Sequence, residues 1–414
     1  RIEIAGADFM NFYLKSTVIY DRFRAIFEAG GHYGQLDDKN AGTIQVEYVS
    51  ANPTGPLHVG HGRGAASGSA IVNIMRAAGY NIEAEYYIND AGNQINNLGL
   101  SVNYRYLELL GKAPGEFPED GYHGADIIDT AKHIVEEAGE KYLDMPEEER
   151  IDFFKEYALK EKLEIIKQDL KRFNVDFDVW FSERTLYPDA VDKANAVLIK
   201  NGNLYEKDGA LWLRSTKYGD DKDRVVIRSN GVPTYFASDI AYHHNKFSRG
   251  FDHLIDIWGA DHHGYVARVK GSMAALGYNP DNFEVVLLQM ISLFRGGEQV
   301  KMSKRSGTSV TLQELMDEVG TDVARYFFVM RSPDSQLDFD LDLAKKRSSE
   351  NPVYYIQYAN ARANSIFRQA KESGTEIPAE PKFSLLTDET ELRLIKKMLE
   401  YPAVIAKAGE ERAP

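Results

Sequence analysis

The chain contains no cysteine among its 414 residues, which excludes disulfides and thiolate zinc sites. It has no apolar run near the roughly 20 residues that a membrane-spanning helix needs. Its N-terminus shows no basic region followed by an apolar stretch, the pattern of a secretory signal. These absences together favour a cytoplasmic protein.

Positive charge is also scarce, because the formal net charge is −14. The shares of hydrophobic residues (43%) and charged residues (27%) are ordinary for a globular protein. Proteins that bind phosphates non-specifically are usually basic. Charge alone therefore argues against a nucleic-acid partner, unless basic residues are concentrated in local patches.

Two βαβ patterns organise the chain. Alternating β-branched residues predict a strand over 43–50. A loop over 52–61 leads into a helix of small residues that runs to about Ala78, and 82–88 reads as a second strand. The pattern then returns as a strand, a helix and a strand at 253–258, 265–276 and 283–294.

An acidic helical stretch at about 125–173 and a β-ribbon at about 203–230 separate the two halves, and the chain turns helical after about 345. We therefore predict an α/β fold, a Rossmann-like parallel sheet split by a helical/β insertion and followed by an α-helical C-terminal domain. Ligands bind such a sheet at the carboxyl ends of its strands. Near the N-terminus, the amphipathic stretch 9–29 predicts a helix.

His58 and His61 flank Gly60 where the first strand passes into its helix. A helix N-terminus offers free N–H groups, and two imidazoles can add hydrogen bonds to a triphosphate. The plainer interpretation is two loop histidines beside a glycine-rich turn. A metal pair is disfavoured because there is no HExxH helix and no third ligand in context. The glycines also miss the GxGxxG spacing, which disfavours a hydride-transfer enzyme.

A second motif, KMSKRSG at 301–307, follows the last strand of the second half. Lys301 and Lys304 can approach polyphosphate as point charges. A basic loop on its own is usually solvated surface. The loop becomes informative together with the histidine motif, because the two motifs occur in this order on one split βαβ frame.

The sequence around both motifs resembles the signature regions of arginyl-tRNA synthetases, a class I family. The matching segments are 47–61, 87–94, 234–239, 259–263 and 301–307. The resemblance implies three parts: the tail of an N-terminal domain with a linker (1–40), a class I catalytic domain with an insertion at about 100–230 (41–345), and the truncated start of an α-helical anticodon-binding domain (346–414). It also implies a monomer that acts on L-arginine, ATP with Mg²⁺ and tRNA(Arg).

The same resemblance assigns site residues by position. The catalytic residues are His58, His61, Lys301 and Lys304. The arginine pocket comprises Glu47, Ser50, Asn52, Tyr235 and Asp239. The ATP side comprises Gly60, Gly259, Asp261, His262 and Met290, and no metal is expected on protein ligands alone.

The chemistry of arginine supports such a pocket. A guanidinium is always charged and has five donors in a planar fork, so it favours carboxylates that accept in pairs. The alternatives are an outward-facing strand carboxylate for Glu47, a helix cap for Asp239, and core positions for Tyr235 and Met290. Of the neighbours at 262 and 263, only one histidine is expected to face ATP.

The implied reaction forms arginyl-adenylate and pyrophosphate, then passes the arginyl group to the 2′ hydroxyl of the terminal adenosine of tRNA(Arg). The family implies that this activation requires bound tRNA. Two other functions are weaker. A small nucleotidyltransferase shares the HxGH motif, but such an enzyme is shorter and lacks both the segments that resemble the arginine pocket and the C-terminal helices. A non-catalytic scaffold is disfavoured by the intact histidines and lysines.

Overall fold

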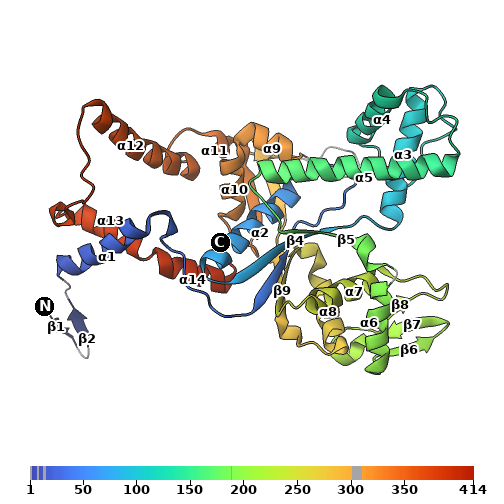
Figure 1. Cartoon of the computed structure of the whole chain (residues 1–414), viewed down its shortest axis with the longest axis horizontal. Coiled ribbons are helices and arrows are strands. Elements are labelled where there is room, and N and C mark those ends of the chain that lie inside the picture. The colour runs from blue at the N-terminus through green and yellow to red at the C-terminus, as the bar shows by residue number, and fades with distance from the viewer. Residues whose placement is uncertain (1, 7–8, 13–14, 188, 301–309) are drawn as a thin grey trace. The chain divides into compact units, whose positions relative to one another are not determined.

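The computed structural model describes residues 2–6, 9–12, 15–187, 189–300 and 310–414. Its contacts divide the chain into two units (Figure 1). The larger unit comprises Gly42–Val72 and Ile82–Arg347, and the smaller comprises Arg1–Ala41, Asn73–Asn81 and Ser348–Pro414. Among the described residues, no helix combines the length and the apolar character needed to cross a membrane.

The larger unit is built on a five-stranded sheet in the order β10-β9-β3-β4-β5. The strands are β3 (Thr43–Glu47), β4 (Asn81–Ile88), β5 (Val179–Ser182), β9 (His253–Gly259) and β10 (Phe283–Leu288). The pairs β10·β9, β9·β3 and β4·β5 are parallel. The first strands of the two βαβ patterns, β3 and β9, are therefore neighbours, and the predicted fold class is confirmed.

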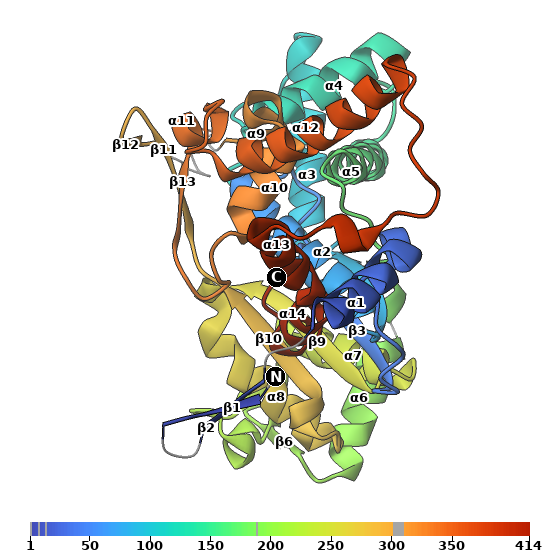
Figure 2. The same ribbon diagram turned by 90° about the vertical axis from the view of Figure 1, so that its left-hand side faces the viewer.

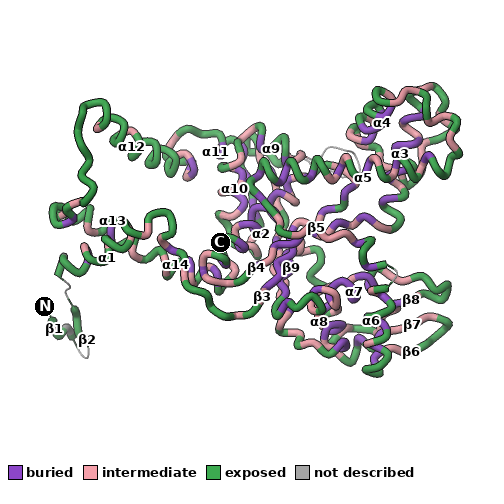
Figure 3. Tube along the Cα trace, viewed as in Figure 1, coloured by how far each residue is buried: buried purple, intermediate pink, exposed green. Residues whose placement is uncertain are grey.

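The helices beside this sheet are α2 (Val59–Ala77), α7 (Tyr235–Ser248) and α8 (His263–Leu276). The run of small residues in α2 has a packing reason. A Cβ at Gly68 would collide with the ring of Tyr48, which is buried just after β3. Helix α2 therefore lies closer to the strand than larger side chains would allow. Figure 3 shows buried residues along the sheet and α2, and also in the helical parts of this unit.

Two insertions separate strands of the sheet along the chain, one before β5 and one after it. The first holds α3 (Asn93–Leu109), α4 (Ala125–Ala138) and α5 (Glu147–Arg172), which share a core around Tyr106 and Phe154. The second holds α6 (Asp189–Lys200) and an antiparallel sheet of β6 (Leu204–Lys207), β7 (Ala210–Leu213) and β8 (Arg224–Ile227). The stretch 100–230 is thus interrupted by β5, which belongs to the central sheet. The domain boundaries themselves stay a prediction.

The predicted single strand at 283–294 is wrong, because it divides after β10. Residues Ile291–Arg295 form β11 of a separate sheet, with β12 (Glu298–Gln299) antiparallel and β13 (Leu337–Asp340) parallel to it. Arg63, which is 2% exposed, binds the backbone between β10 and β11 through its guanidinium. It donates to the carbonyl oxygens of Gln289 (2.6 Å), Met290 (3.5 Å), Ser332 (3.1 Å) and Ser335 (2.8 Å). Helices α9 (Leu312–Val319), α10 (Thr321–Val329) and α11 (Leu341–Lys345) complete the unit.

We expect Arg63→Met to lower the free energy of unfolding of the larger unit by at least about 2 kcal/mol. The substitution removes the arginine donor from the carbonyl oxygens of Gln289 and Ser335, and each donor lost costs roughly 1–3 kcal/mol. The carbonyl oxygens of Met290 and Ser332 also accept from the N–H groups of Leu337 and Ser335. Chemical denaturation followed by circular dichroism measures the loss. Arg172→Met is the control, because Arg172 forms an exposed pair with Asp317 (2.5 Å) whose loss should cost less than about 1 kcal/mol. Equal effects of the two substitutions would contradict the role of Arg63.

The smaller unit contains β1 (Ile2–Ala5), β2 (Phe9–Phe12), α1 (Ser16–Ala29), α12 (Pro352–Glu372), α13 (Glu389–Leu399) and α14 (Tyr401–Glu411). Figure 2 shows α1 beside α13. The helix predicted over 9–29 is too long, because residues 9–12 pair antiparallel with residues 2–5 and form a strand.

Short 3₁₀ helices occur in both units. They lie at Gly30–His32, Glu183–Leu186, Ser215–Tyr218, Ala260–His262, Pro280–Asn282 and Phe383–Leu385.

Candidate active site

The site begins at a strained turn directly after β3. Val49 and Ser50 have φ angles of 68° and 39°, in the left-handed region that a β-branched residue such as valine rarely adopts. The Ser50 N–H donates to the Tyr48 carbonyl (3.0 Å). The turn brings the Ser50 hydroxyl back to Glu47, where it donates to Oε1 (2.8 Å), while the N–H of Tyr87 donates to Ser50 Oγ (3.1 Å). The turn thus fixes the orientation of the Glu47 carboxylate.

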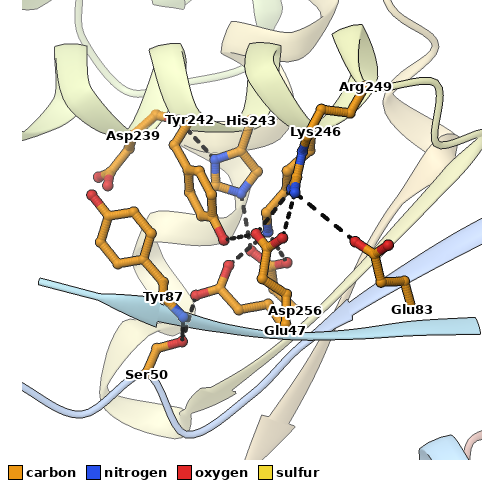
Figure 4. Close-up of polar contacts among 11 residues, drawn as sticks. Glu47, Ser50, Glu83, Tyr87, Asp239, Tyr242, His243, Lys246, Arg249 and Asp256 are labelled. Carbon is orange, nitrogen blue, oxygen red and sulfur yellow. Dashed lines mark hydrogen bonds and ion pairs between the residues drawn. The ribbon is translucent and has the colours of Figure 1, made fainter. Parts of the chain in front are cut away.

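Lys246 lies at the centre of a buried charge network, shown in Figure 4. It is 0% exposed, and its Nζ lies 2.6 Å from Glu47 Oε2 and 2.8 Å from Asp256 Oδ1. Register places Glu47 directly opposite Asp256 on the neighbouring strand. His243 Nε2 lies 2.9 Å from the other oxygen of Asp256. Glu47 is therefore an inward carboxylate with a cation partner, and the outward-facing alternative is wrong.

These bonds set the protonation of the network. Burial lowers the pKa of Lys246, but Asp256 and Glu47 outweigh it and hold the pKa above its ordinary value. Burial raises the pKa of Asp256, but Lys246 and His243 outweigh it and hold the pKa below its ordinary value. For Glu47, burial dominates and raises the pKa, against the opposing effect of Lys246. The lysine is thus charged between two carboxylates.

Helix α7 carries the next carboxylate of the candidate site. The helix starts at Tyr235, and Thr234 caps it by accepting from the Ala237 N–H, so Asp239 lies in the second turn and is not a cap. Asp239 accepts a hydrogen bond from the Tyr265 hydroxyl. Burial raises the pKa of Asp239, and the Tyr265 bond opposes this. Asp239, His243 and Lys246 recur at spacings of four and three, so they share one face of α7.

A cavity of about 320 Å³ opens between these groups. Five of the residues proposed from the sequence line it, namely Glu47, Ser50, Asp239, Gly259 and His262. The remaining lining residues are Val49, Tyr87, Tyr242, His243, Asp256, Ile257, Trp258 and Tyr265. The cavity lies at the carboxyl ends of β3 and β9, the position that the parallel sheet predicts.

Other residues proposed from the sequence lie outside the lining of this cavity. Tyr235 is 66% exposed at the first position of α7, and Met290 is 66% exposed between β10 and β11, so neither is a core residue. Asn52 is exposed and accepts from the side-chain amide of Asn89 (2.9 Å). The side chain of Asp261 is 71% exposed. His263, unlike His262, is absent from the lining.

Glu183, in the 3₁₀ helix after β5, is a carboxylate that the sequence analysis missed. It is 5% exposed and accepts from the Tyr187 hydroxyl (3.4 Å). Burial, Asp90 and Asp239 raise the pKa of Glu183 to about 7. Burial also raises the pKa of Tyr87, and the charges of Glu183, Asp239 and Glu47 all add to that effect. Three carboxylates therefore act electrostatically on the Tyr87 hydroxyl.

The histidine motif forms the start of α2. The rings of His58 and His61 stack with their centroids 3.7 Å apart. Nδ1 of His58 accepts from the Gly60 N–H (3.1 Å), and Nδ1 of His61 accepts from the His58 N–H (3.2 Å). In a neutral imidazole, an accepting Nδ1 leaves the proton on Nε2. Both rings can therefore act as Nε2–H donors.

The chain that follows the second motif contacts the histidine motif. Lys301 and Lys304 lie outside the described residues. Thr311 forms an antiparallel bridge with His58, the Val59 N–H donates to the Val310 carbonyl (3.2 Å), and the Leu312 N–H donates to the Leu57 carbonyl (2.7 Å). Residues 310–312 therefore lie beside the start of α2.

Comparison with known proteins agrees with this geometry. The family model for the class I tRNA synthetase (R) catalytic domain matches residues 22–337, and the model for the DALR anticodon binding domain matches residues 356–414. The arginine–tRNA ligase of Carboxydothermus hydrogenoformans is 54% identical over 417 residues, covering 100% of this chain and 75% of the relative. The chain belongs to the arginyl-tRNA synthetase family. The corresponding ligase of Oceanobacillus iheyensis is also 54% identical, covering 100% and 74%.

Solved structures of this family share the fold. A Campylobacter jejuni protein assigned as an arginyl-tRNA synthetase superposes with a TM-score of 0.87 at 38% identity, covering 97% of this chain and 87% of the other. The arginyl-tRNA synthetase of Thermus thermophilus superposes with a TM-score of 0.73 at 22% identity, covering 98% and 76%. The predicted family and the predicted type of enzyme, a class I arginine–tRNA ligase, are confirmed.

Proposed function

We propose that the chain activates L-arginine with ATP and transfers it to tRNA(Arg) in the cytoplasm, as a monomer. The observation that carries this proposal is the cavity itself, whose acidic lining lies at the carboxyl ends of β3 and β9. Carboxylates suit a dicationic amino acid, and a helix N-terminus with two imidazole donors suits a triphosphate. The DALR match at 356–414 supports tRNA as the acceptor.

The two cationic ends of arginine have separate carboxylates in this proposal. Asp239 faces the guanidinium, with Glu183 close enough to act on its charge. Glu47 faces the α-ammonium. Asp239 and the Lys246 that holds Glu47 are seven residues apart on α7, about 10 Å along the helix. That separation is large enough for each end of an extended arginine to meet its own carboxylate. Ser50, Asn52 and Tyr235 complete the proposed pocket.

The chemistry needs no protein nucleophile. The arginine carboxylate attacks the α-phosphorus of ATP, the bond to pyrophosphate breaks, and pyrophosphate leaves with the electron pair. His58, His61, Lys301 and Lys304 stabilise the charge that develops on the phosphates. Gly60, Gly259, Asp261, His262 and Met290 surround the nucleotide. Mg²⁺ arrives with ATP, held largely by phosphate oxygens and water.

ATP–pyrophosphate exchange tests the function. We expect exchange that depends on L-arginine and on tRNA(Arg), with lysine in place of arginine as the matched control. Lysine is also dicationic but offers a single point charge instead of a planar fork. Exchange supported equally by lysine and arginine, or by neither, would contradict the proposal.

A further inference from the structure

We propose that Lys246 is a positioning residue that sets the charge presented to the α-ammonium of the amino acid substrate. It orients Glu47 and keeps that carboxylate ionised beside the buried Asp256. This inference rests on the proposed function, because it assigns a cause to the affinity for arginine.

The charge balance follows from the contacts. Two carboxylates, Glu47 and Asp256, share the single ammonium of Lys246 at 2.6 and 2.8 Å. His243 also faces Asp256 through Nε2 and the Asp239 carbonyl oxygen through Nδ1 (2.8 Å), so Asp256 has a second donor of its own. Ser50 occupies the second oxygen of Glu47 with a hydroxyl, which brings no charge. The negative charge of Glu47 therefore depends on the ammonium of Lys246.

Without Lys246, the two carboxylates would repel each other across paired strands. His243 would still support Asp256 through Nε2 (2.9 Å), so Glu47 would be the group that takes a proton. Among the described residues, several groups act on Glu47. They include Lys246, His243 and Asp239 on α7, Asp256 on β9, the Ser50 hydroxyl, and the phenols of Tyr87 and Tyr242. A protonated Glu47 no longer attracts an ammonium.

The same helix and sheet contain a second ion pair that lies outside the cavity lining. Arg249, one turn after Lys246, donates both terminal nitrogens to Glu85 on β4, at 2.6 and 2.9 Å. Glu85 is 0% exposed, and the side chain of Arg249 is 26% exposed. This pair also ties α7 to the sheet. It therefore separates the structural role of a cation on α7 from the role proposed for Lys246.

The central test is Lys246→Met, assayed by exchange with tRNA(Arg) present. We expect KM for arginine to rise about 10- to 100-fold while KM for ATP stays within about two-fold, because the lost contacts are to a charged group on the arginine side. The variant's KM for arginine should also fall as the pH rises from 6 to 8.5. Glu47 regains its charge above its raised pKa, so the wild type, with Lys246 in place, should show a weaker slope.

A charge-matched variant separates electrostatics from packing. Lys246→Met combined with Asp256→Asn removes the lysine and its second carboxylate together, so Glu47 alone supplies one negative charge. We expect this double variant to bind arginine more tightly than Lys246→Met does. The control is Arg249→Met, which should lower the melting temperature and leave KM for arginine within about two-fold. Lys246→Gln replaces Lys246→Met if the latter does not fold.

The outcomes are distinct. The inference is wrong if Lys246→Met raises both KM values equally, if it behaves like Arg249→Met, or if the double variant binds arginine no better than the single one. A wild-type chain without arginine-dependent exchange would instead refute the proposed function, and the inference with it.

Discussion

His61→Ala is expected to lower the rate of arginine activation by about 10²–10³ with little change in the melting temperature. Removing one preorganised donor to a developing charge costs roughly 2.7–4 kcal/mol. The accepting Nδ1 of His61 leaves Nε2–H as the donor, and the stacked ring of His58 holds it in place. Single-turnover formation of arginyl-adenylate with tRNA(Arg) present measures the effect on chemistry separately from product release.

His244→Ala is a matched histidine control. His244 lies on α7, is absent from the cavity lining, and bonds through Nδ1 to the Tyr278 hydroxyl (2.7 Å). Its loss should alter stability and leave the activation rate within about two-fold. A His61→Ala enzyme with a near-wild-type rate would remove His61 from the catalytic residues and leave it as a helix-start residue.

Local periodicity was sufficient to predict the frame that positions these histidines. The alternation over 43–50, the small-residue helix after it and the apolar strand at 253–258 are all local patterns. Helix α2 and strand β9 follow them closely, whereas β3 ends at Glu47, three residues before the predicted end. Their pairing was also accessible, because parallel strands joined by helices form one sheet. The strained turn at Val49 was not, since a β-branched residue gives no local sign of a positive φ.

The error over 283–294 lies where a long-range contact decides the local structure. These residues read as one apolar strand, but Arg63, more than 200 positions earlier, binds the carbonyl oxygens at its midpoint and separates β10 from β11. The sequence carries no local signal for that contact. The error at 9–12 has a different cause, because these residues pair with the nearby residues 2–5.

The site shows the same division. Glu47 and Asp239 came from the family resemblance, and their roles stay predictions. Lys246 and Asp256 were missed, although each left a trace. Asp256 is a charge inside the apolar strand HLIDIW, and Lys246 follows Asp239 by seven residues on the same helix face. A buried acid in a strand implies a buried cation nearby.

Asp239→Asn is expected to raise KM for arginine by about 10²–10³. Removing one partner of a buried charge pair costs roughly 3–5 kcal/mol, and Asp239 is the cavity carboxylate that has no lysine partner of its own among the described residues. The bond from Tyr265 survives, because an amide oxygen still accepts it. Exchange kinetics at saturating ATP and tRNA(Arg) measure the change.

Citrulline distinguishes loss of the guanidinium contact from a general disturbance of the pocket. Its urea is neutral and close in shape to the guanidinium, so wild-type Asp239 and Glu183 would face it as uncompensated buried carboxylates. We expect the wild type to bind arginine at least about 100-fold more tightly than citrulline. In Asp239→Asn that preference should shrink, because arginine loses its counter-charge while citrulline loses an unfavourable neighbour. Calorimetry with tRNA and a non-hydrolysable ATP analogue gives all four affinities. An unchanged preference in the variant would show that the guanidinium binds elsewhere, since only a group facing it can discriminate a charge at that end of the substrate.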